Sequence, residues 1–295
     1  MSSLALTEKR NPNTIDIDLM DSLSIAKIIN QEDQKIALAI NKVLPQIGEA
    51  IEVIAQAFLQ GGRLAYFGAG TSGRLGILDA SECWPTFGVK HEMVCGYIAG
   101  GDKALRFSVE NAEDNSELGK QDLAAFAPTS NDIVVGISAN GAPRYVLTVL
   151  EEAKKIGCKT IGISSNPEAK LQHFSDVFIN PIVGEEVITG SSRMKSGTAQ
   201  KMILNMLSTG AMIRIGKTYQ NYMIDVRMVN EKLIDRGCRF VSEIAKISYD
   251  EAKEYLKKSA YNVKTACVMA TKNYNKEEAE KILTKNNGIL RKVIN

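Results

Sequence analysis

The sequence predicts an α/β fold in which helices cover a parallel sheet, with further helical segments at both ends of the chain. Between Arg63 and Asn180, short apolar segments alternate with helical ones. The stretches before and after this region show helical periodicity without strands. Short, continuously apolar strands that alternate with helices are typical of a parallel sheet buried on both faces.

Residues 1–54 are predicted to form a helical extension. Within 15–60, apolar residues recur at spacings of three and four, which is the period of an amphipathic helix. They are Ile25, Ile28, Ile29, Ile36, Ala39 and Ile40. Gly61 and Gly62 end the pattern. We therefore expect helix up to the start of the first strand.

Residues 55–235 are predicted to form the sheet domain. The predicted strands are 63–67, 93–98, 132–137, 160–164 and 176–180. The predicted helices between and after them are 74–80, 108–126, 145–156 and 167–174. A final helix over 195–214 is apolar on much of its circumference, so we expect it to be deeply buried.

Residues 236–295 are predicted to form a small all-α domain. Three short, charged, amphipathic helices follow one another there with no strand among them. They span 251–258, 263–272 and 277–285.

Charge and hydropathy exclude several classes of protein. The chain has 295 residues, and 36 Lys and Arg nearly balance 34 Asp and Glu, which leaves a net charge of +2. No basic footprint for nucleic acid is present, and no apolar run approaches the roughly 20 residues needed to span a bilayer. Residues 1–13 lack the apolar segment of a secretion signal. We expect a soluble, cytoplasmic protein without nucleic-acid or membrane partners.

The available side chains limit the chemistry. The five cysteines are scattered without a CxxC pair, so neither a zinc site nor a disulfide framework is expected. Only two histidines are present, His91 and His173, and histidine is the usual general base and the commonest metal ligand. Acid–base chemistry must therefore come from carboxylates, lysines or tyrosines, and we expect no metal.

The first candidate binding loop is Gly68–Arg74, which follows a predicted strand and opens a helix. It satisfies G-x-G-x-x-G, the dinucleotide-binding pattern. The acidic residue that should close the next strand is missing, since no carboxylate follows 93–98 until Asp102. The adjacent hydroxyls of Thr71 and Ser72 favour a terminal phosphate, held by backbone N–H groups and the start of the helix. A structural glycine turn without a ligand is the alternative.

Two further loops are rich in hydroxyl groups. The second, 136–143, contains Ser138 and Asn140, and the third, 189–198, contains Ser191, Ser192 and Lys195. Each set of hydroxyls is equally consistent with ordinary helix caps. Because ligands of open parallel sheets bind beyond the carboxyl ends of the strands, three such loops together favour a small phosphorylated ligand.

Candidate acid–base groups lie in two stretches. Glu82 follows the first loop by one helix, and Glu113 belongs to an acidic segment with Glu110 and Asp114. A solvated acidic face is the alternative for this segment. Cys83 is not a convincing nucleophile, because no histidine is positioned by the sequence to activate it.

Taken together, these stretches resemble the N-acetylmuramic acid 6-phosphate etherases, a family within the SIS (sugar isomerase) fold that is related to the glucokinase regulatory proteins. The resemblance spans nearly the whole chain and keeps the spacing of the motifs. The matching stretches are 10–13, 67–76, 79–83, 99–101, 110–114, 189–201, 205–209, 225–226 and 230–233.

The chain departs from the family pattern in the second loop. The family commonly carries Ala-Ala-Ser-Gly there, whereas this chain has Ser138-Ala139-Asn140-Gly141. The hydroxyl has moved to Ser138, and Asn140 can donate a hydrogen bond in place of the missing serine. Trp84 stands where a proline is usual.

The resemblance implies cleavage of the 3-O-lactyl ether of N-acetylmuramic acid 6-phosphate to N-acetylglucosamine 6-phosphate and D-lactate, without metal or cofactor. It implies Glu82 and Glu113 as the two catalytic carboxylates. Our hypothesis is that Glu82 is the acid on the ether oxygen and Glu113 the base at C2 and for water. The expected phosphate ligands are Thr71, Ser72, Ser138, Ser191, Ser192 and, as a lesser candidate, Lys195, with Gly70, Gly73 and Asn140 shaping the loops. It also implies a homodimer.

Three other functions remain open at this point. A non-catalytic sugar-phosphate regulator would keep the loops but would not need Glu82 and Glu113. An aldose–ketose isomerase would share proton abstraction at C2 but release nothing. A nicotinamide dehydrogenase would need the ribose-binding acid that this sequence lacks.

Overall fold

The computed structural model describes residues 4–295. It contains two compact units. The first consists of the chain up to Ser81 together with His91–Gly210, and the second of Glu82–Lys90 together with Ala211–Asn295. Among the described residues, no helix combines the length and apolar character that crossing a membrane requires.

A five-stranded parallel sheet forms the centre of the first unit. Its order is β2-β1-β3-β4-β5. The strands are β1 (Leu64–Gly68), β2 (Val94–Ile98), β3 (Ile133–Ile137), β4 (Lys159–Ile163) and β5 (Val177–Ile179). Every residue of β1 and β3 is buried, which is why these strands are continuous apolar runs in the sequence. All five predicted strands are confirmed.

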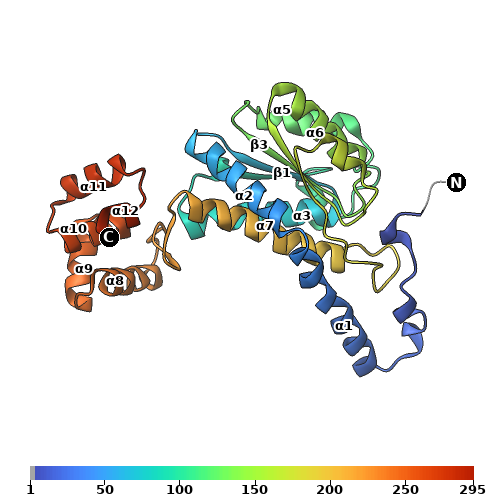
Figure 1. The fold of residues 1–295 in the computed structure, drawn as a ribbon, viewed down its shortest axis with the longest axis horizontal. Helices are drawn as coiled ribbons and strands as arrows, with labels where there is room; N and C mark the ends of the chain where they lie inside the picture. Colours follow the sequence, from blue (N-terminus) through green and yellow to red (C-terminus); the bar gives the residue numbers. More distant parts are fainter. Residues whose placement is uncertain (1–3) are drawn as a thin grey trace. The chain divides into compact units, whose positions relative to one another are not determined.

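Helices cover both faces of this sheet (Figure 1). α5 (Ser116–Phe126) and α6 (Arg144–Ile156) lie on one face, whereas α2 (Leu44–Leu59), α3 (Gly70–Phe87) and α7 (Lys195–Arg214) lie on the other. The predicted α/β class is therefore confirmed. The expected burial of α7 is confirmed too, because Ala199, Ile203, Leu204, Leu207 and Ala211 have no exposed surface.

The N-terminal helical stretch consists of two helices. α1 spans Ser22–Asn41, and α2 begins at Leu44. The expectation of uninterrupted helix fails here because Pro45 lies at the start of α2, where a missing N–H is tolerated, and cannot continue a preceding helix. Three short 3-10 turns precede α1: η1 (Leu6–Glu8), η2 (Pro12–Thr14) and η3 (Ile17–Leu19).

Two predicted helices are shorter than the periodicity indicated. The helix expected over 108–126 begins only at Ser116, because the Asn115 side chain accepts the first free N–H groups of α5 at 3.0 and 3.2 Å. Residues 107–115 form an open loop after the short α4 (Lys103–Arg106) instead. The helix expected over 167–174 is only the 3-10 turn η5 (Lys170–Phe174). A further turn, η4 (His91–Met93), precedes β2.

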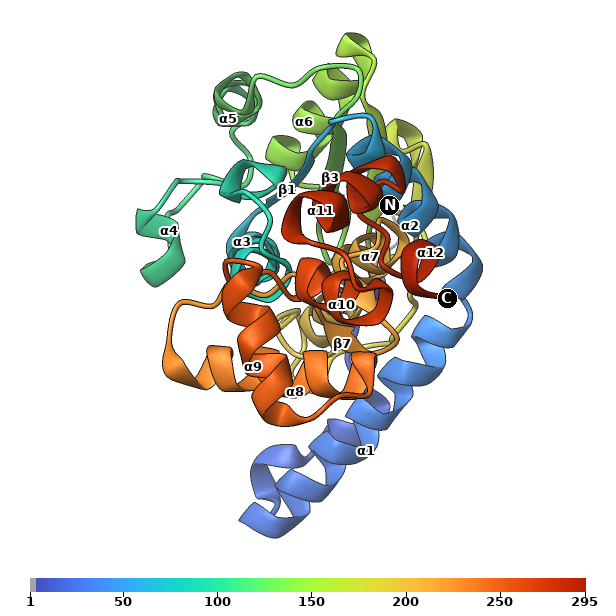
Figure 2. The ribbon, with the colours of Figure 1, turned by 90° about the vertical axis from the view of Figure 1, so that its left-hand side faces the viewer.

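The second unit is mainly helical (Figure 2). Its helices are α8 (Glu231–Ala245), α9 (Tyr249–Lys258), α10 (Val263–Lys272), α11 (Lys276–Lys285) and α12 (Arg291–Ile294). α10 packs against the other four and is correspondingly buried. The three predicted C-terminal helices are confirmed. α8, α12 and the small hairpin of β6 (Thr218–Tyr219) and β7 (Tyr222–Met223) were not predicted. The domain boundaries at 54/55 and 235/236 remain predictions.

Candidate active site

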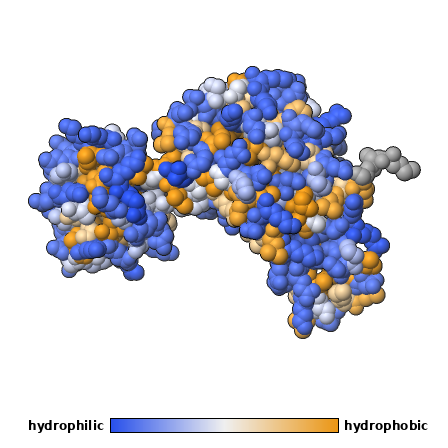
Figure 3. Space-filling view, viewed as in Figure 1, coloured by the Kyte–Doolittle hydropathy of each residue, from blue (hydrophilic) through white to orange (hydrophobic). Residues whose placement is uncertain are grey.

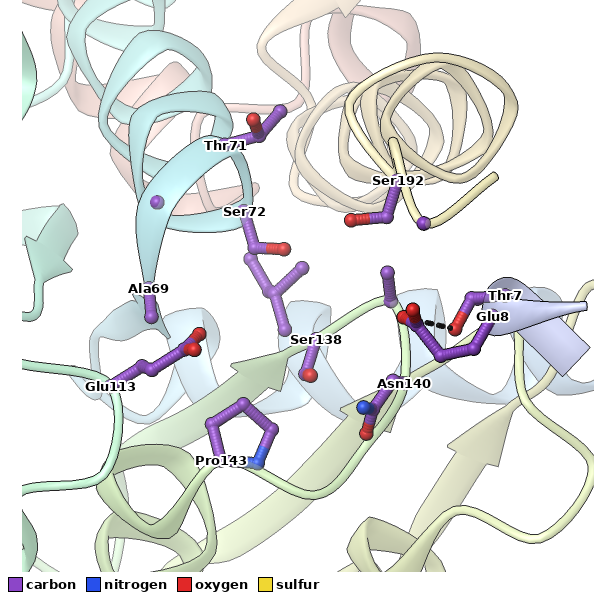
Figure 4. Close-up of a pocket in the computed structure, with 14 residues that line it drawn as sticks. Thr7, Glu8, Ala69, Thr71, Ser72, Glu113, Ser138, Asn140, Pro143 and Ser192 are labelled. Atoms are coloured by element: carbon purple, nitrogen blue, oxygen red, sulfur yellow. Dashed lines mark hydrogen bonds between the residues drawn. The ribbon is translucent and has the colours of Figure 1, made fainter. Parts of the chain in front are cut away.

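A cavity of about 270 Å³ opens at the carboxyl ends of β1 and β3 in the first unit (Figure 4). Five separate segments of the chain form its walls. The lining residues are Thr7, Glu8, Ala69, Gly70, Thr71, Ser72, Glu113, Ile137, Ser138, Ala139, Asn140, Pro143, Gly190 and Ser192. The cavity is near the lower end of the size range of small-molecule sites.

The first loop brings Gly70, Thr71 and Ser72 to the cavity. The turn from β1 into α3 needs glycine, because a Cβ on Gly68 would lie 2.6 Å from the backbone nitrogen of Gly73. A Cβ on Gly73 would in turn lie 2.6 Å from the carbonyl oxygen of Gly68, so Gly73 is needed for packing. Gly73 does not line the cavity. α3 begins at Gly70 beside the cavity, and the dipole at the N-terminus of this helix favours an anion there.

Ser72 also connects two helices. Its hydroxyl donates a hydrogen bond to Oε1 of Gln200 on α7 at 2.9 Å, and both side chains are buried. This contact fixes the position of Ser72 at the start of α3. The hydroxyl oxygen of Ser72 can still accept a hydrogen bond.

The second loop contributes Ser138 and Asn140. The hydroxyl oxygen of Ser138 accepts the N–H of Gly141 at 3.0 Å, so its own proton is available to a ligand. The backbone of Asn140 is fixed by Asn166, whose side chain donates to the Asn140 carbonyl at 3.0 Å. Asn140 thus lines the cavity at the position where the family's serine is missing.

The third loop contributes less than the sequence suggested. Ser192 lines the cavity, but Ser191 and Lys195 do not. The Lys195 ammonium is buried and binds the carboxylate of Glu32 on α1, with 2.7 Å between Nζ and Oε2. Glu186 accepts the N–H of Lys195 at 2.8 Å and holds the start of α7. Lys195 therefore connects α7 to α1 in this structure.

An N-terminal segment forms part of the cavity wall through two residues that the sequence analysis did not single out. Thr7 and Glu8 line it, and the segment is attached to the third loop by hydrogen bonds. The Thr7 carbonyl accepts the N–H of Gly190 at 3.1 Å. The Asn11 side chain donates to the Glu185 carbonyl at 3.2 Å, and the Thr14 hydroxyl donates to the Val187 carbonyl at 2.8 Å.

Glu113 is the candidate catalytic carboxylate that lies in the cavity. It belongs to the open loop 107–115, and its carbonyl accepts the N–H of Tyr145 at 3.0 Å, which anchors the loop to α6. Figure 4 shows Glu113 and Glu8 on opposite sides of the cavity, with Ser138 between them. Within residues 4–295 no Lys or Arg lines this cavity, so an anion there would be held by hydroxyls, amides and the dipole of α3.

Glu82 is not among the residues that line the cavity. It lies on α3, eleven residues after Thr71, which corresponds to about 16 Å along a helix axis. Its side chain is exposed. The pairing of Glu82 with Glu113 remains a prediction.

A buried carboxylate lies on α3 between the first loop and Glu82. Asp79 accepts hydrogen bonds from the hydroxyls of Tyr66 at 2.9 Å and Ser208 at 3.1 Å. Burial raises the pKa of Asp79 to about 6, although these two hydrogen bonds and the charge of Lys201 oppose the rise. Asp79 is thus a titrating group within the packing of β1, α3 and α7.

Comparison with known proteins identifies the domains of the chain. The family described as the SIS domain matches residues 104–210, and the glucokinase regulatory protein N-terminal SIS domain matches 46–154. The C-terminal lid domain of glucokinase regulatory protein matches 220–266. A phosphoheptose isomerase from Francisella tularensis shares the fold, with a TM-score of 0.50 and 22% identity over 66% of this chain and 100% of that one. The fold and the three loops define a SIS-domain protein.

Full-length relatives identify the family more closely. A Glaesserella parasuis protein named N-acetylmuramic acid 6-phosphate etherase is 52% identical over 96% of this chain and 93% of its own. Proteins of the same name from Pasteurella multocida and Yersinia pestis are 51% and 50% identical over at least 96% of each chain. The chain belongs to the N-acetylmuramic acid 6-phosphate etherase family.

Proposed function

We propose that this protein is a lyase that cleaves the lactyl ether of N-acetylmuramic acid 6-phosphate to N-acetylglucosamine 6-phosphate and D-lactate. The observation that carries the proposal is the position of Glu113 in a hydroxyl-lined cavity, in a chain about half identical to proteins named for this activity. Such a reaction serves the breakdown and recycling of cell-wall amino sugars. We place it in the cytoplasm, since a phosphorylated sugar is too polar to leave through a bilayer.

The chemistry proceeds by elimination and hydration. Opening of the sugar ring exposes the C1 aldehyde, which acidifies the proton on C2. Glu113 removes that proton, lactate leaves from C3 as its ether oxygen is protonated, and water then adds at C3 while C2 is reprotonated. The C3–O bond breaks without direct attack on an unactivated ether. Each positioned acid or base contributes about 10²- to 10⁴-fold to the rate.

The phosphate group is proposed to bind at the start of α3. Thr71, Ser138 and Ser192 supply hydroxyl donors, and Asn140 supplies an amide donor. Ser72 lines the same cavity, but its hydroxyl donates to the phosphate only when it releases its hydrogen bond to Gln200. Hydrogen bonds from neutral groups and a helix N-terminus suffice for phosphate binding without a lysine. Lys195 and Ser191 are not assigned to the phosphate, because neither lines the cavity.

We propose a homodimer in which Glu82 of one subunit completes the cavity of the other. The position of Glu82, exposed on α3 and about 16 Å along the helix from Thr71, supports an active site shared between subunits. Exposed apolar side chains on α1 and α2, including Leu38, Leu44 and Leu59, are available to an interface. Figure 3 shows hydrophobic side chains among the hydrophilic ones over α2 and α7.

Incubation of the full chain with N-acetylmuramic acid 6-phosphate in D₂O tests the reaction. We expect D-lactate together with N-acetylglucosamine 6-phosphate that carries deuterium at C2. Absence of lactate would contradict the etherase activity. Lactate without deuterium at C2 would contradict elimination and hydration.

A non-catalytic sugar-phosphate regulator is the second candidate function. The matches of 46–154 and 220–266 to domains of glucokinase regulatory protein favour it. Such a protein would bind the sugar phosphate in the same cavity but release no lactate, so the D₂O experiment separates the two functions.

A further inference from the structure

A second cavity, of about 230 Å³, lies directly beside the first in the same unit. The two cavities share three lining residues, Ala69, Gly70 and Glu113. Its other walls come from α3, the end of β2 and the loop before α5. The remaining lining residues are Arg74, Ala99, Ala104, Phe107, Ser108, Val109, Glu110, Asn111 and Ala112. Glu113 therefore lies where both spaces meet.

Arg74 gives the second cavity a different chemistry from the first. It is the one Lys or Arg among the residues that line either cavity. Its guanidinium is half-buried, and Nε and Nη2 donate to the carbonyls of Leu105 and Ala104 at 3.1 and 2.7 Å. Carbonyl groups hold the guanidinium in place, and the carboxylates of Glu110 and Glu113 line the same cavity. No ion pair of Arg74 occurs within residues 4–295.

The proposed substrate carries two separate anionic groups. The phosphate is attached at C6, and the lactyl carboxylate is attached through the ether oxygen at C3. Glu113 must reach C2, which is bonded to C3. If the phosphate binds at the start of α3 and C2 lies at Glu113, the lactyl group on C3 can enter the second cavity, because Glu113 lines both cavities.

We propose that the second cavity is the subsite for the lactyl group and that Arg74 binds its carboxylate. This inference rests on the proposed etherase function and adds a specificity-determining residue to it. Arg74 retains free N–H groups on Nη1, and a guanidinium matches a carboxylate in geometry as well as in charge. The contact orients the leaving group so that its ether oxygen stays beside C3, and it selects lactyl ethers over sugar phosphates that lack the acid.

Substrates that differ only in the charge of the lactyl group test the proposal. The natural substrate is compared with its lactamide analogue, in which the carboxylate is replaced by a neutral amide of similar size. We expect the wild-type protein to prefer the carboxylate by about 10- to 100-fold in kcat/KM, the range of a hydrogen bond to a charged group. Arg74→Gln should reduce this preference to within about threefold.

Two controls separate binding of the lactyl group from general damage. Lys103→Gln removes an equal charge from the neighbouring α4, and Lys103 lines neither cavity, so the preference should persist. N-acetylglucosamine 6-phosphate, which has no lactyl group, should bind Arg74→Gln as tightly as wild type. If this variant does not fold, Arg74→Lys, which keeps the positive charge but not the planar guanidinium, takes its place and should weaken the preference; equal kcat/KM for the two substrates in wild type would overturn the proposal in any case.

Equal kcat/KM for the acid and the amide in the wild type would overturn the proposal, as would an undiminished preference in Arg74→Gln. Either result leaves the etherase activity intact. Failure of the etherase function itself would be recognised separately, because neither substrate would then release its lactyl group.

Discussion

Lys195 and Glu32 form a buried ion pair between the first residue of α7 and the middle of α1. Their charged atoms are 2.7 Å apart, and the two side chains are only 1% and 2% exposed. Lys35 and the amide of Asn13 also donate to Glu32. The pair lies 163 positions apart in the sequence and holds the N-terminal helix against the loop that carries Ser192.

Removing one partner of this pair should destabilise the fold. Lys195→Met leaves a buried carboxylate without its main partner, and such changes cost about 3–5 kcal/mol. Lys195→Met combined with Glu32→Leu should recover much of that loss, since neither charge then remains buried. Urea unfolding of the single and double variants measures both effects. If Lys195 were instead a phosphate ligand, Lys195→Met would weaken sugar-phosphate binding without lowering stability.

Acid should weaken the same contact. Burial alone would raise the pKa of Glu32, but hydrogen bonds from Lys195, Lys35 and Asn13 outweigh it and lower the pKa from 4.5 to about 2. A carboxylate with a lowered folded-state pKa contributes stability above its unfolded pKa and loses it as the pH falls. We therefore expect the stability advantage of wild type over Glu32→Gln to decline between about pH 4.5 and 2. A difference that does not change over this range would contradict the ionised pair.

The stability contributed by Asp79 should depend on pH in the opposite direction. Burial raises its pKa from 3.8 to about 6, so the folded state favours the protonated form. The stability linked to this proton is complete below about pH 3.8 and is lost as the pH rises through 6, on the order of 2–3 kcal/mol in total. Asp79→Asn, which cannot ionise, should gain stability relative to wild type between pH 4 and 7. Thermal unfolding at several pH values measures the difference in stability. Asp176→Asn is the control: Asp176 forms an ion pair with Lys154 and has a lowered pKa, so its replacement should give no such gain.

The strands and the hydroxyl loops could be predicted because their signals are local. A buried parallel strand is a continuous apolar run, and Gly68–Arg74 carries its own turn chemistry. The ion pair of Lys195 could not be predicted, because a lysine that binds phosphate and a lysine in a buried ion pair have the same local sequence pattern. Only the fold brings it to Glu32.

The contribution of Glu8 was missed for a related reason. Nothing in its local sequence points to the cavity, and its segment reaches the site through contacts with residues more than 170 positions away. The break between α1 and α2 was foreseeable from Pro45, since proline begins helices but does not continue them.

Mixed dimers test whether Glu82 and Glu113 act together across an interface. Glu82→Gln and Glu113→Gln should each lower lactate release by about 10²- to 10⁴-fold. A dimer with one subunit of each kind has two active sites. If each site is shared between subunits, one of them contains both substitutions and the other contains neither. Random mixing of equal amounts gives half mixed dimers, so refolded mixtures should recover about one quarter of wild-type activity. Sites built from a single subunit would show no recovery.

Loosening the N-terminal segment should affect substrate binding more than the chemical step. Thr14 is buried, and its hydroxyl donates to the Val187 carbonyl at 2.8 Å, which fixes the third loop near Gly190 and Ser192. Thr14→Val keeps the shape of the side chain but leaves that carbonyl unpaired, at a cost of about 1–3 kcal/mol. Because Ser192 and Glu8 then lose their fixed positions while Glu113 on its own loop does not, we expect KM to rise about tenfold and kcat to change by less than about threefold. Thr14→Ser retains the hydroxyl and should restore the wild-type KM. A loss confined to kcat would show instead that the segment acts on the transition state.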